Sequence, residues 1–229
     1  MPRAGLVSRR SLGQTVAMPD SRRRSRPAAA AEAASDWLTV LPLVEDGLRL
    51  RLLRESDLPA FLGYRSDPEV ARFQGWATMD ADAARAYLRA QADSAPHAAR
   101  TWRQIGIADA SDDRLLGDLG IWLFPHAREA ELGISLARAE QGRGVGRRAV
   151  GAACVLLFAE AGVVRIRAAV DVRNLPSLRM FAAAGFLPYG MHSVVCKGET
   201  CEERLFARVR GDGPACDTAH PGRSTGAAS

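Results

Sequence analysis

The sequence contains almost no lysine. Lys197 is the single lysine, and the other members of the 31 basic residues are arginines. A Walker-type nucleotide site needs the pattern Gly-x4-Gly-Lys-Ser/Thr, because its lysine reaches the terminal phosphates of the nucleotide. The one lysine of this chain does not stand in such a pattern. The sequence therefore excludes a Walker-type site.

Long apolar runs and paired cysteines are also missing. No apolar run approaches the roughly 20 residues that a membrane-spanning helix needs, so no such helix is expected. The 4 cysteines form no Cys-x-x-Cys pair and have no paired histidine spacing, so no metal site is predicted. Residues 8–12 look briefly like a twin-arginine export signal, but no apolar stretch follows them. We expect a cytoplasmic protein whose cysteines stay reduced.

Positive charge is concentrated at one end of the chain. The formal net charge is +5, and residues 1–26 hold seven arginines and one aspartate, which sum to +6. The remainder therefore sums to 5 − 6 = −1. A basic body that binds nucleic acid is not supported by this distribution, so nucleic acid is an unlikely partner, although a basic arm that binds it stays open.

The composition of both ends differs from that of the middle. Residues 1–36 mix Arg, Ser, Pro and Ala without periodic apolar spacing, and residues 211–229 are small, polar and rich in Pro and Gly. We predict that both ends are disordered. For the N-terminal end, a transit peptide and a start codon placed too early remain open. The folded unit is expected at residues 37–210, as a single domain.

Apolar spacing within residues 37–210 predicts an α/β domain. The expected order is a strand at 48–52, three helices beginning near 57, 67 and 80, strands at 102–107, 115–124 and 130–136, a helix at 145–160, a strand at 163–170, a helix at 174–184, and strands at 186–195 and 203–209. Short connections make most neighbouring strands antiparallel. Only the two strands joined through the helix at 145–160 need be parallel. The fold class is thus a mixed, mostly antiparallel sheet flanked by helices.

A glycine-rich loop at Gln141–Gly146 precedes the helix expected at 145–160. Such a loop is an anion site, because unpaired N–H groups and the positive end of the helix dipole face the same way. A dinucleotide site would need a third glycine at position 147, which is Arg147, and a place in the first turn of a parallel sheet. This loop instead follows an antiparallel meander, so the dinucleotide class is disfavoured.

Gln141-x-x-Gly144-x-Gly146 matches the Q/R-x-x-G-x-G/A signature of the GNAT acetyltransferases. Three further segments resemble the RimJ/RimL-like branch of that family, and the resemblance covers about residues 45–208. These segments are Arg72–Trp76, Ala130–Leu136, and the run Asn174-Leu175-Pro176-Ser177, Phe181, Ala184-Gly185-Phe186. The resemblance implies a GNAT fold with splayed central parallel strands, and acetyl-CoA as cosubstrate.

The resemblance also implies where acetyl-CoA binds. Backbone N–H groups of the glycine loop would hold the pyrophosphate, and the pantetheine arm would lie between strands 130–136 and 164–170. A backbone N–H near Leu136 would polarise the thioester carbonyl. Asn174 would reach the arm, or would cap its helix, and the two roles are compatible. The residues expected to hold acetyl-CoA are Leu136, Gln141, Gly142, Arg143, Gly144, Val145, Gly146, Arg147, Asn174 and Ser177.

The implied reaction is direct attack of a primary amine on acetyl-CoA in a ternary complex. Glu131 is the candidate base, although an exposed strand charge explains it equally well. Many GNAT enzymes place a tyrosine where Phe181 stands here, and phenylalanine cannot donate a proton. Ser177 or water would then protonate the thiolate. This position also motivates an alternative, a non-catalytic sensor that binds acyl-CoA.

The acceptor is an amine, either a protein N-terminus or a small amine or antibiotic. We expect its site among the first helices and the final hairpin, where each aromatic side chain could instead belong to the core. The candidate acceptor residues are Phe73, Gln74, Trp76, Tyr87, Trp122 and His192. The expected assembly is a monomer or a homodimer, with no membrane partner.

Overall fold

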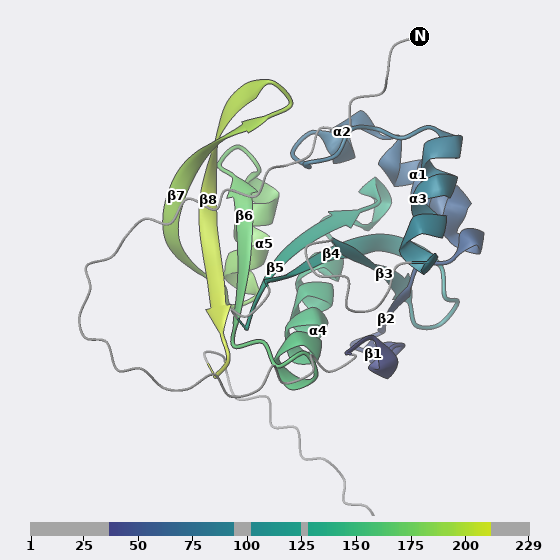
Figure 1. Ribbon diagram of the computed structural model, residues 1–229, viewed down its shortest axis with the longest axis horizontal. Helices are drawn as coiled ribbons and strands as arrows, with labels where there is room; N and C mark the ends of the chain where they lie inside the picture. Colours follow the sequence, from purple (N-terminus) through teal and green to yellow (C-terminus); the bar gives the residue numbers. More distant parts are fainter. Residues whose placement is uncertain (1–36, 94–101, 125–127, 212–229) are drawn as a thin grey trace, which may run out of the picture.

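The computed structural model describes residues 37–93, 102–124 and 128–211 (Figure 1). The disorder predicted for residues 1–36 and for the C-terminal tail after Gly211 lies outside these residues. The strands are β1 (Leu43–Glu45), β2 (Leu48–Leu52), β3 (Arg103–Asp109), β4 (Leu115–Phe124), β5 (Glu129–Leu136), β6 (Arg165–Asp171), β7 (Leu187–Cys196) and β8 (Glu199–Val209). The α-helices are α1 (Leu58–Arg65), α2 (Pro68–Ala71), α3 (Ala81–Asp93), α4 (Val145–Ala159) and α5 (Leu175–Ala183), and three short 3₁₀ segments lie at Trp37–Val40, Glu55–Asp57 and Arg138–Glu140.

The strands form one sheet in the order β1-β2-β3-β4-β5-β6-β8-β7. Every neighbouring pair is antiparallel except β5 and β6, which confirms the predicted mixed sheet. Strand β8 begins four residues before the predicted position, because Lys197 and Gly198 both adopt positive φ and close a two-residue hairpin. None of the described helices is long and apolar enough to cross a membrane.

Helices cover both faces of the sheet (Figure 1). On one face, α4 buries Ala149, Ala153 and Leu157 completely, at the three- and four-residue spacing of a helix that packs one side. On the other face, α1 and α3 pack Phe61 and Leu88 into a second, smaller cluster over β4. The central strands therefore present one surface to α4 and the opposite surface to α1 and α3.

Strands β5 and β6 pair over only part of their length. Their parallel ladder joins Glu129 to Arg165, Ala130 to Ile166, and Glu131 to Arg167. Beyond these three pairs, β5 continues to Leu136 and β6 continues to Asp171 without pairing to each other. The expected splay of the central parallel strands is confirmed, and it leaves the last part of β5 with an open edge.

A buried ion pair fixes α1 to the sheet. Arg65 and Asp118 are only 2% and 1% exposed, and Arg65 Nη2 donates to both carboxylate oxygens at 2.8 Å. The Tyr64 hydroxyl donates to the same carboxylate at 2.5 Å. Burial is the main cause that raises the pKa of Tyr64 well above its usual value, and it raises the pKa of Tyr87 to about 12. The indole of Trp76 lies 4.3 Å from the Arg65 guanidinium, so this cluster also holds the loop after α2.

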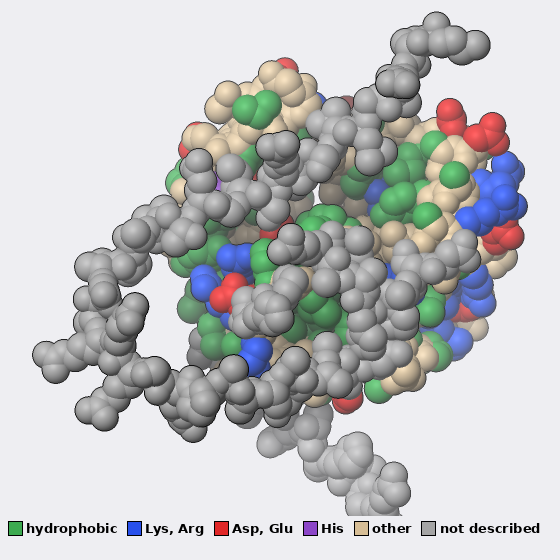
Figure 2. Space-filling model, viewed as in Figure 1, with side chains coloured by type: hydrophobic (Ala, Val, Ile, Leu, Met, Phe, Trp, Pro, Cys, Tyr) green, Lys and Arg blue, Asp and Glu red, His purple; other side chains and the backbone are tan. Residues whose placement is uncertain are grey.

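Asp118→Asn should lower the free energy of unfolding by about 3–5 kcal/mol, because it leaves a buried guanidinium without its counter-charge. Urea unfolding followed by circular dichroism measures this loss. The control is Asp82→Asn on α3, where charged side chains cover the outer surface (Figure 2) and Asp82 pairs with Arg85 at 3.0 Å while fully accessible to solvent. A loss for Asp118→Asn no larger than that of the control would show that the buried pair does not hold the fold.

Candidate active site

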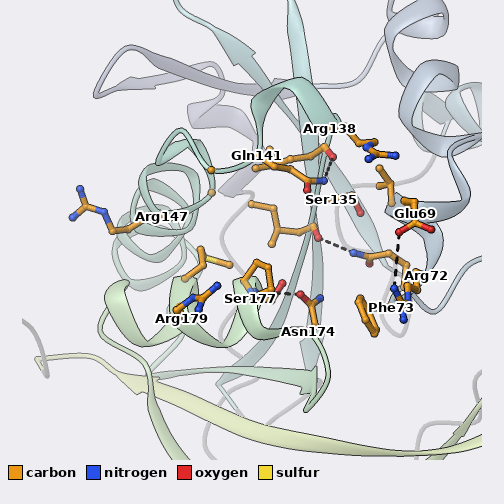
Figure 3. A pocket seen from close by; sticks show the side chains of 18 of the residues that line it. Glu69, Arg72, Phe73, Ser135, Arg138, Gln141, Arg147, Asn174, Ser177 and Arg179 are labelled. Atoms are coloured by element: carbon orange, nitrogen blue, oxygen red, sulfur yellow. Dashed lines mark hydrogen bonds and ion pairs between the residues drawn. The ribbon is translucent and has the colours of Figure 1, made fainter.

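A cavity of about 620 Å³ opens where β5 and β6 separate. This volume is typical of small-molecule sites, which span roughly 300–1,000 Å³. Its walls are the end of β5, the glycine loop, the first turns of α4 and α5, and α2 with the loop after it (Figure 3). The cavity thus gathers segments that lie far apart in the sequence.

The glycine loop has a backbone that other residues rarely adopt. Gly142 and Gly144 have φ of +72° and +75°, in the left-handed region that favours glycine. Gly144 is the N-cap of α4 and has no side chain to accept from the first N–H groups of the helix. Those N–H groups have no partner within the helix, and the positive end of the helix dipole adds to them. The loop is therefore a site for an anionic group on the cavity wall.

Gly146 lets α4 approach β5 and α5 closely. A Cβ at this position would lie 3.4 Å from Met180 Cγ and 3.5 Å from Leu136 Cδ1. Its neighbour Val145 is buried at 4% exposure in the core. Val145 therefore stands beneath the cavity and can offer it only backbone atoms.

Two arginines line the cavity without a partner among the described residues. Arg147 projects from the first turn of α4, and Arg179 from α5 (Figure 3). Arg143 instead donates to Glu140 at 2.9 Å and does not line the cavity. Of the two arginines predicted at the loop, Arg147 is therefore the better placed to contact an anion in the cavity. The sequence reasoning missed Arg179, although its spacing of three from Pro176 places both on one side of α5.

The open edge of β5 carries two carbonyls that side-chain amides occupy. Gln74 Nε2 donates to the Ile134 carbonyl at 3.0 Å, and Gln141 Nε2 donates to the Leu136 carbonyl at 3.1 Å (Figure 3). Both carbonyls therefore point away from β4. Because the N–H and C=O of one strand residue point to the same side, the N–H groups of Ile134 and Leu136 also face the open edge. This edge can pair with an extended chain that contains amides.

The start of α5 lies across the cavity from that edge. Asn174 Oδ1 accepts from the Ser177 N–H at 3.2 Å, which confirms the interpretation of Asn174 as the helix N-cap. Asn174 and Ser177 both line the cavity. Phe181, one turn later, is 3% exposed and packs edge-on against Phe186 at 5.2 Å, so it fills the core.

The predicted acceptor residues lie in several places. Phe73 and Gln74 line the cavity. Trp76 packs on Arg65, and Tyr87 stacks on Phe61 at 5.8 Å, both within the α1–α3 cluster. The two remaining residues also lie outside the lining: Trp122 packs against Trp102 at 5.9 Å, and His192 contacts Glu203 at 3.0 Å.

Glu131 does not line the cavity. It lies opposite Trp122 on β4 and opposite Arg167 on β6. Side chains alternate along a strand, so Glu131 shares a face of β5 with Ser135, four residues or roughly 13 Å away. Any action of Glu131 on a group bound near Leu136 would therefore need intervening water.

Several lining residues were not predicted from the sequence. They are Glu69, Val70, Arg72, Ile134, Ser135, Arg138, Pro176, Arg179 and Met180. Residues of α2 could not be found without the fold. Ser135 could have been found, because the two-residue period of β5 places it on the face of Glu131.

Known proteins resemble this chain in sequence and in fold. A sequence model of the family described as "Acetyltransferase (GNAT) domain" matches residues 47–187. The "Probable N-acetyltransferase YjcK" of Bacillus subtilis (strain 168) is 36% identical over 88 residues, which span 38% of this chain and about half (49%) of that relative.

Solved structures share the fold at low sequence identity. A GNAT-family acetyltransferase from Bacillus anthracis superposes with a TM-score of 0.65 at 18% identity, over 72% of this chain and 96% of that one. Mycobacterium smegmatis RimJ in complex with CoA-disulfide gives a TM-score of 0.64 at 21% identity, over 73% and 84% of the chains. Spermidine N-acetyltransferase from Vibrio cholerae, in complex with CoA and spermine, gives 0.63 at 17% identity, over 73% and 97%.

Gly144→Asp should weaken the binding of CoA strongly, because a carboxylate at the helix N-terminus would repel its phosphates. Gly144→Asn is the matched control, since asparagine has a similar shape and tolerates the left-handed backbone equally well. Isothermal titration should show CoA binding to the aspartate variant weaker by about tenfold or more than to the asparagine variant. Equal affinities would contradict a phosphate site at this loop.

Proposed function

Since the chain belongs to the GNAT acetyltransferase family, we propose that it transfers the acetyl group of acetyl-CoA to a primary amine. The observation that carries this proposal is the glycine loop at the start of α4, which opens into the cavity between β5 and β6. The amine would attack the thioester directly while both substrates are bound. Protein N-termini and small amines are the acceptor classes that this chemistry serves.

Three parts of the cavity wall would bind different parts of acetyl-CoA. N–H groups of the loop and of the first turn of α4 would hold the pyrophosphate, with Arg147 and Arg179 adding positive charge. The amides of the pantetheine arm would pair with the open edge of β5, in place of the side-chain amides of Gln74 and Gln141. Asn174, which lines the cavity across from that edge, would face the arm.

Two proton transfers accompany the reaction. The attacking amine loses a proton, which Glu131 would take through water, given its distance along β5. The departing thiolate gains a proton from water or from Ser177, since Phe181 has no hydroxyl and is buried in the core. The N–H of Leu136 or Ile134 would stabilise the negative charge that develops on the thioester oxygen.

An acceptor screen tests the proposal. The full chain is incubated with acetyl-CoA and, in separate reactions, peptides, polyamines, amino acids or aminoglycosides. We expect thiol release with at least one class, and an acetylated amine detected by mass spectrometry. CoA binding without any thiol release would contradict the enzymatic function.

Glu131→Gln should lower kcat by roughly 10²-fold if Glu131 is the base, because the amide cannot accept the proton. The acidic limb of the pH profile of kcat should disappear with it. Glu129→Gln is the matched control, since Glu129 lies on the same face of β5 and pairs with Arg165 and Arg167. An unchanged rate and pH profile for Glu131→Gln would remove Glu131 from the mechanism.

A further inference from the structure

Ser135 has a hydroxyl that hydrogen-bonds to no described residue. The residue is 5% exposed, lines the cavity and stands on β5 next to the open edge (Figure 3). In the described part of the chain its Oγ makes no hydrogen bond and no other polar contact. The Ser135 hydroxyl is therefore available to a polar atom of a ligand in the cavity.

Open space lies beside Ser135 on the same face of β5. Gly133 is two residues earlier, roughly 7 Å along the strand. No heavy atom of the described residues lies within 4 Å of where a Gly133 Cβ would stand. Gly120 lies directly opposite on β4 and has close neighbours. A Cβ added to Gly120 would lie 3.1 Å from both Trp102 and Gln104. The space over Gly133 is thus bounded on the β4 side and open above β5.

This space lies next to the atoms that would hold the thioester. Ile134 stands between Gly133 and Ser135, and its backbone faces the open edge of β5. The Ile134 side chain points to the opposite face, 3.8 Å from where a Gly146 Cβ would stand. An amine over Gly133 and Ser135 would therefore approach a thioester at this edge from the face opposite α4.

The carboxylates on the neighbouring strands and on the cavity wall are already engaged within the protein. The ion pairs are Asp118 of β4 with Arg65 at 2.8 Å, Glu129 of β5 with Arg167 at 3.5 Å, Asp171 of β6 with Arg173 at 2.6 Å, and Glu69 of α2 with Arg72 at 4.0 Å. Glu203 of β8 contacts His192 at 3.0 Å. Glu131 also interacts with another group of the protein. A second ammonium group, as in a polyamine, would find no unpaired carboxylate among these residues. The charges favour an acceptor whose reacting amine is its single cationic group.

We propose that Ser135 and Gly133 form the acceptor subsite, an inference that rests on the proposed acyl transfer. The Ser135 Oγ accepts a hydrogen bond from the attacking amine, and the space over Gly133 takes the group that the amine carries. The amine nitrogen bonds to the thioester carbon, the carbon–sulfur bond breaks, CoA leaves as a thiolate, and the amine proton passes to water. The fitting acceptors are monoamines with a small neighbouring group, such as glycinamide or alaninamide.

Ser135→Ala tests the hydrogen bond. With alaninamide as acceptor, kcat/KM for the amine should fall about tenfold, the effect of one lost hydrogen bond. The KM for acetyl-CoA should stay unchanged, which a general loss of structure would not allow. The control is Ser193→Ala on β7, which removes an exposed hydroxyl bonded to Glu202 and should change neither constant.

Gly133→Ala tests the space. Gly133 does not have a positive φ, so alanine fits its strand backbone. The added methyl should lower kcat/KM more for leucinamide than for glycinamide, and their ratio should change by about threefold or more. Gly63→Ala on α1 is the control, because it also adds a methyl where no described atom lies within 4 Å. Spermidine should be a poorer acceptor than alaninamide for the parental chain.

The outcomes separate this inference from the proposed function. If the parental chain releases no thiol with any amine, both the proposed acyl transfer and the acceptor subsite are overturned. If it turns over and Ser135→Ala and Gly133→Ala keep the parental constants for every amine, only the acceptor subsite is overturned. Preference of the parental chain for spermidine would overturn the assignment of a monoamine.

Discussion

The site depends on one feature of the sheet, the early end of pairing between β5 and β6. Three residue pairs hold the two strands together, and the rest of each strand lies apart. This leaves backbone groups of Ile134 and Leu136 facing a cavity, where a fully paired sheet would consume them. It also places the start of α4 at the same opening, because the chain after β5 passes through the 3₁₀ segment Arg138–Glu140 and the glycine loop into that helix. An anion site and an open strand edge thus meet in one cavity.

The cavity wall that α2 and the loop after it form is held by a buried ion pair and by a contact from the last hairpin. Arg65 binds Asp118 on β4 and lies under Trp76, which fixes the loop that carries Phe73 and Gln74. Lys197, at the tip of the β7–β8 hairpin, donates to the Ala71 carbonyl at 2.6 Å. The last hairpin is thereby tied to the end of α2. These contacts set the distance between the two walls of the cavity, so the buried ion pair supports the site as well as the fold.

Local chemistry explains what the sequence could predict. The glycine loop, the N-cap at Asn174 and the two helices that follow them depend on neighbours a few residues away, and the positions of these four features were predicted correctly. Tertiary contacts decide the rest. Trp76 and Tyr87 were expected near the acceptor, but a buried arginine from α1 holds both in a separate cluster, and nothing near them in the sequence indicates this. The period of β5 indicates which face carries Ser135, but only the fold shows that this face lines the cavity.

The glycine loop and the region near Ser135 would bind their ligands through different interactions. This difference explains why the sequence indicates the cosubstrate more clearly than the acceptor. At the loop, backbone N–H groups attract negative charge together with Arg147 and Arg179, which have no partner among the described residues, and a phosphate group suits such a site. Near Ser135 the ionised side chains are paired with one another, so shape and a single hydroxyl remain to choose the acceptor. A charged subsite leaves a sequence signature because few residue types can build it. A subsite made from a glycine and a serine on one strand leaves almost none, although a single methyl group there is enough to change its volume.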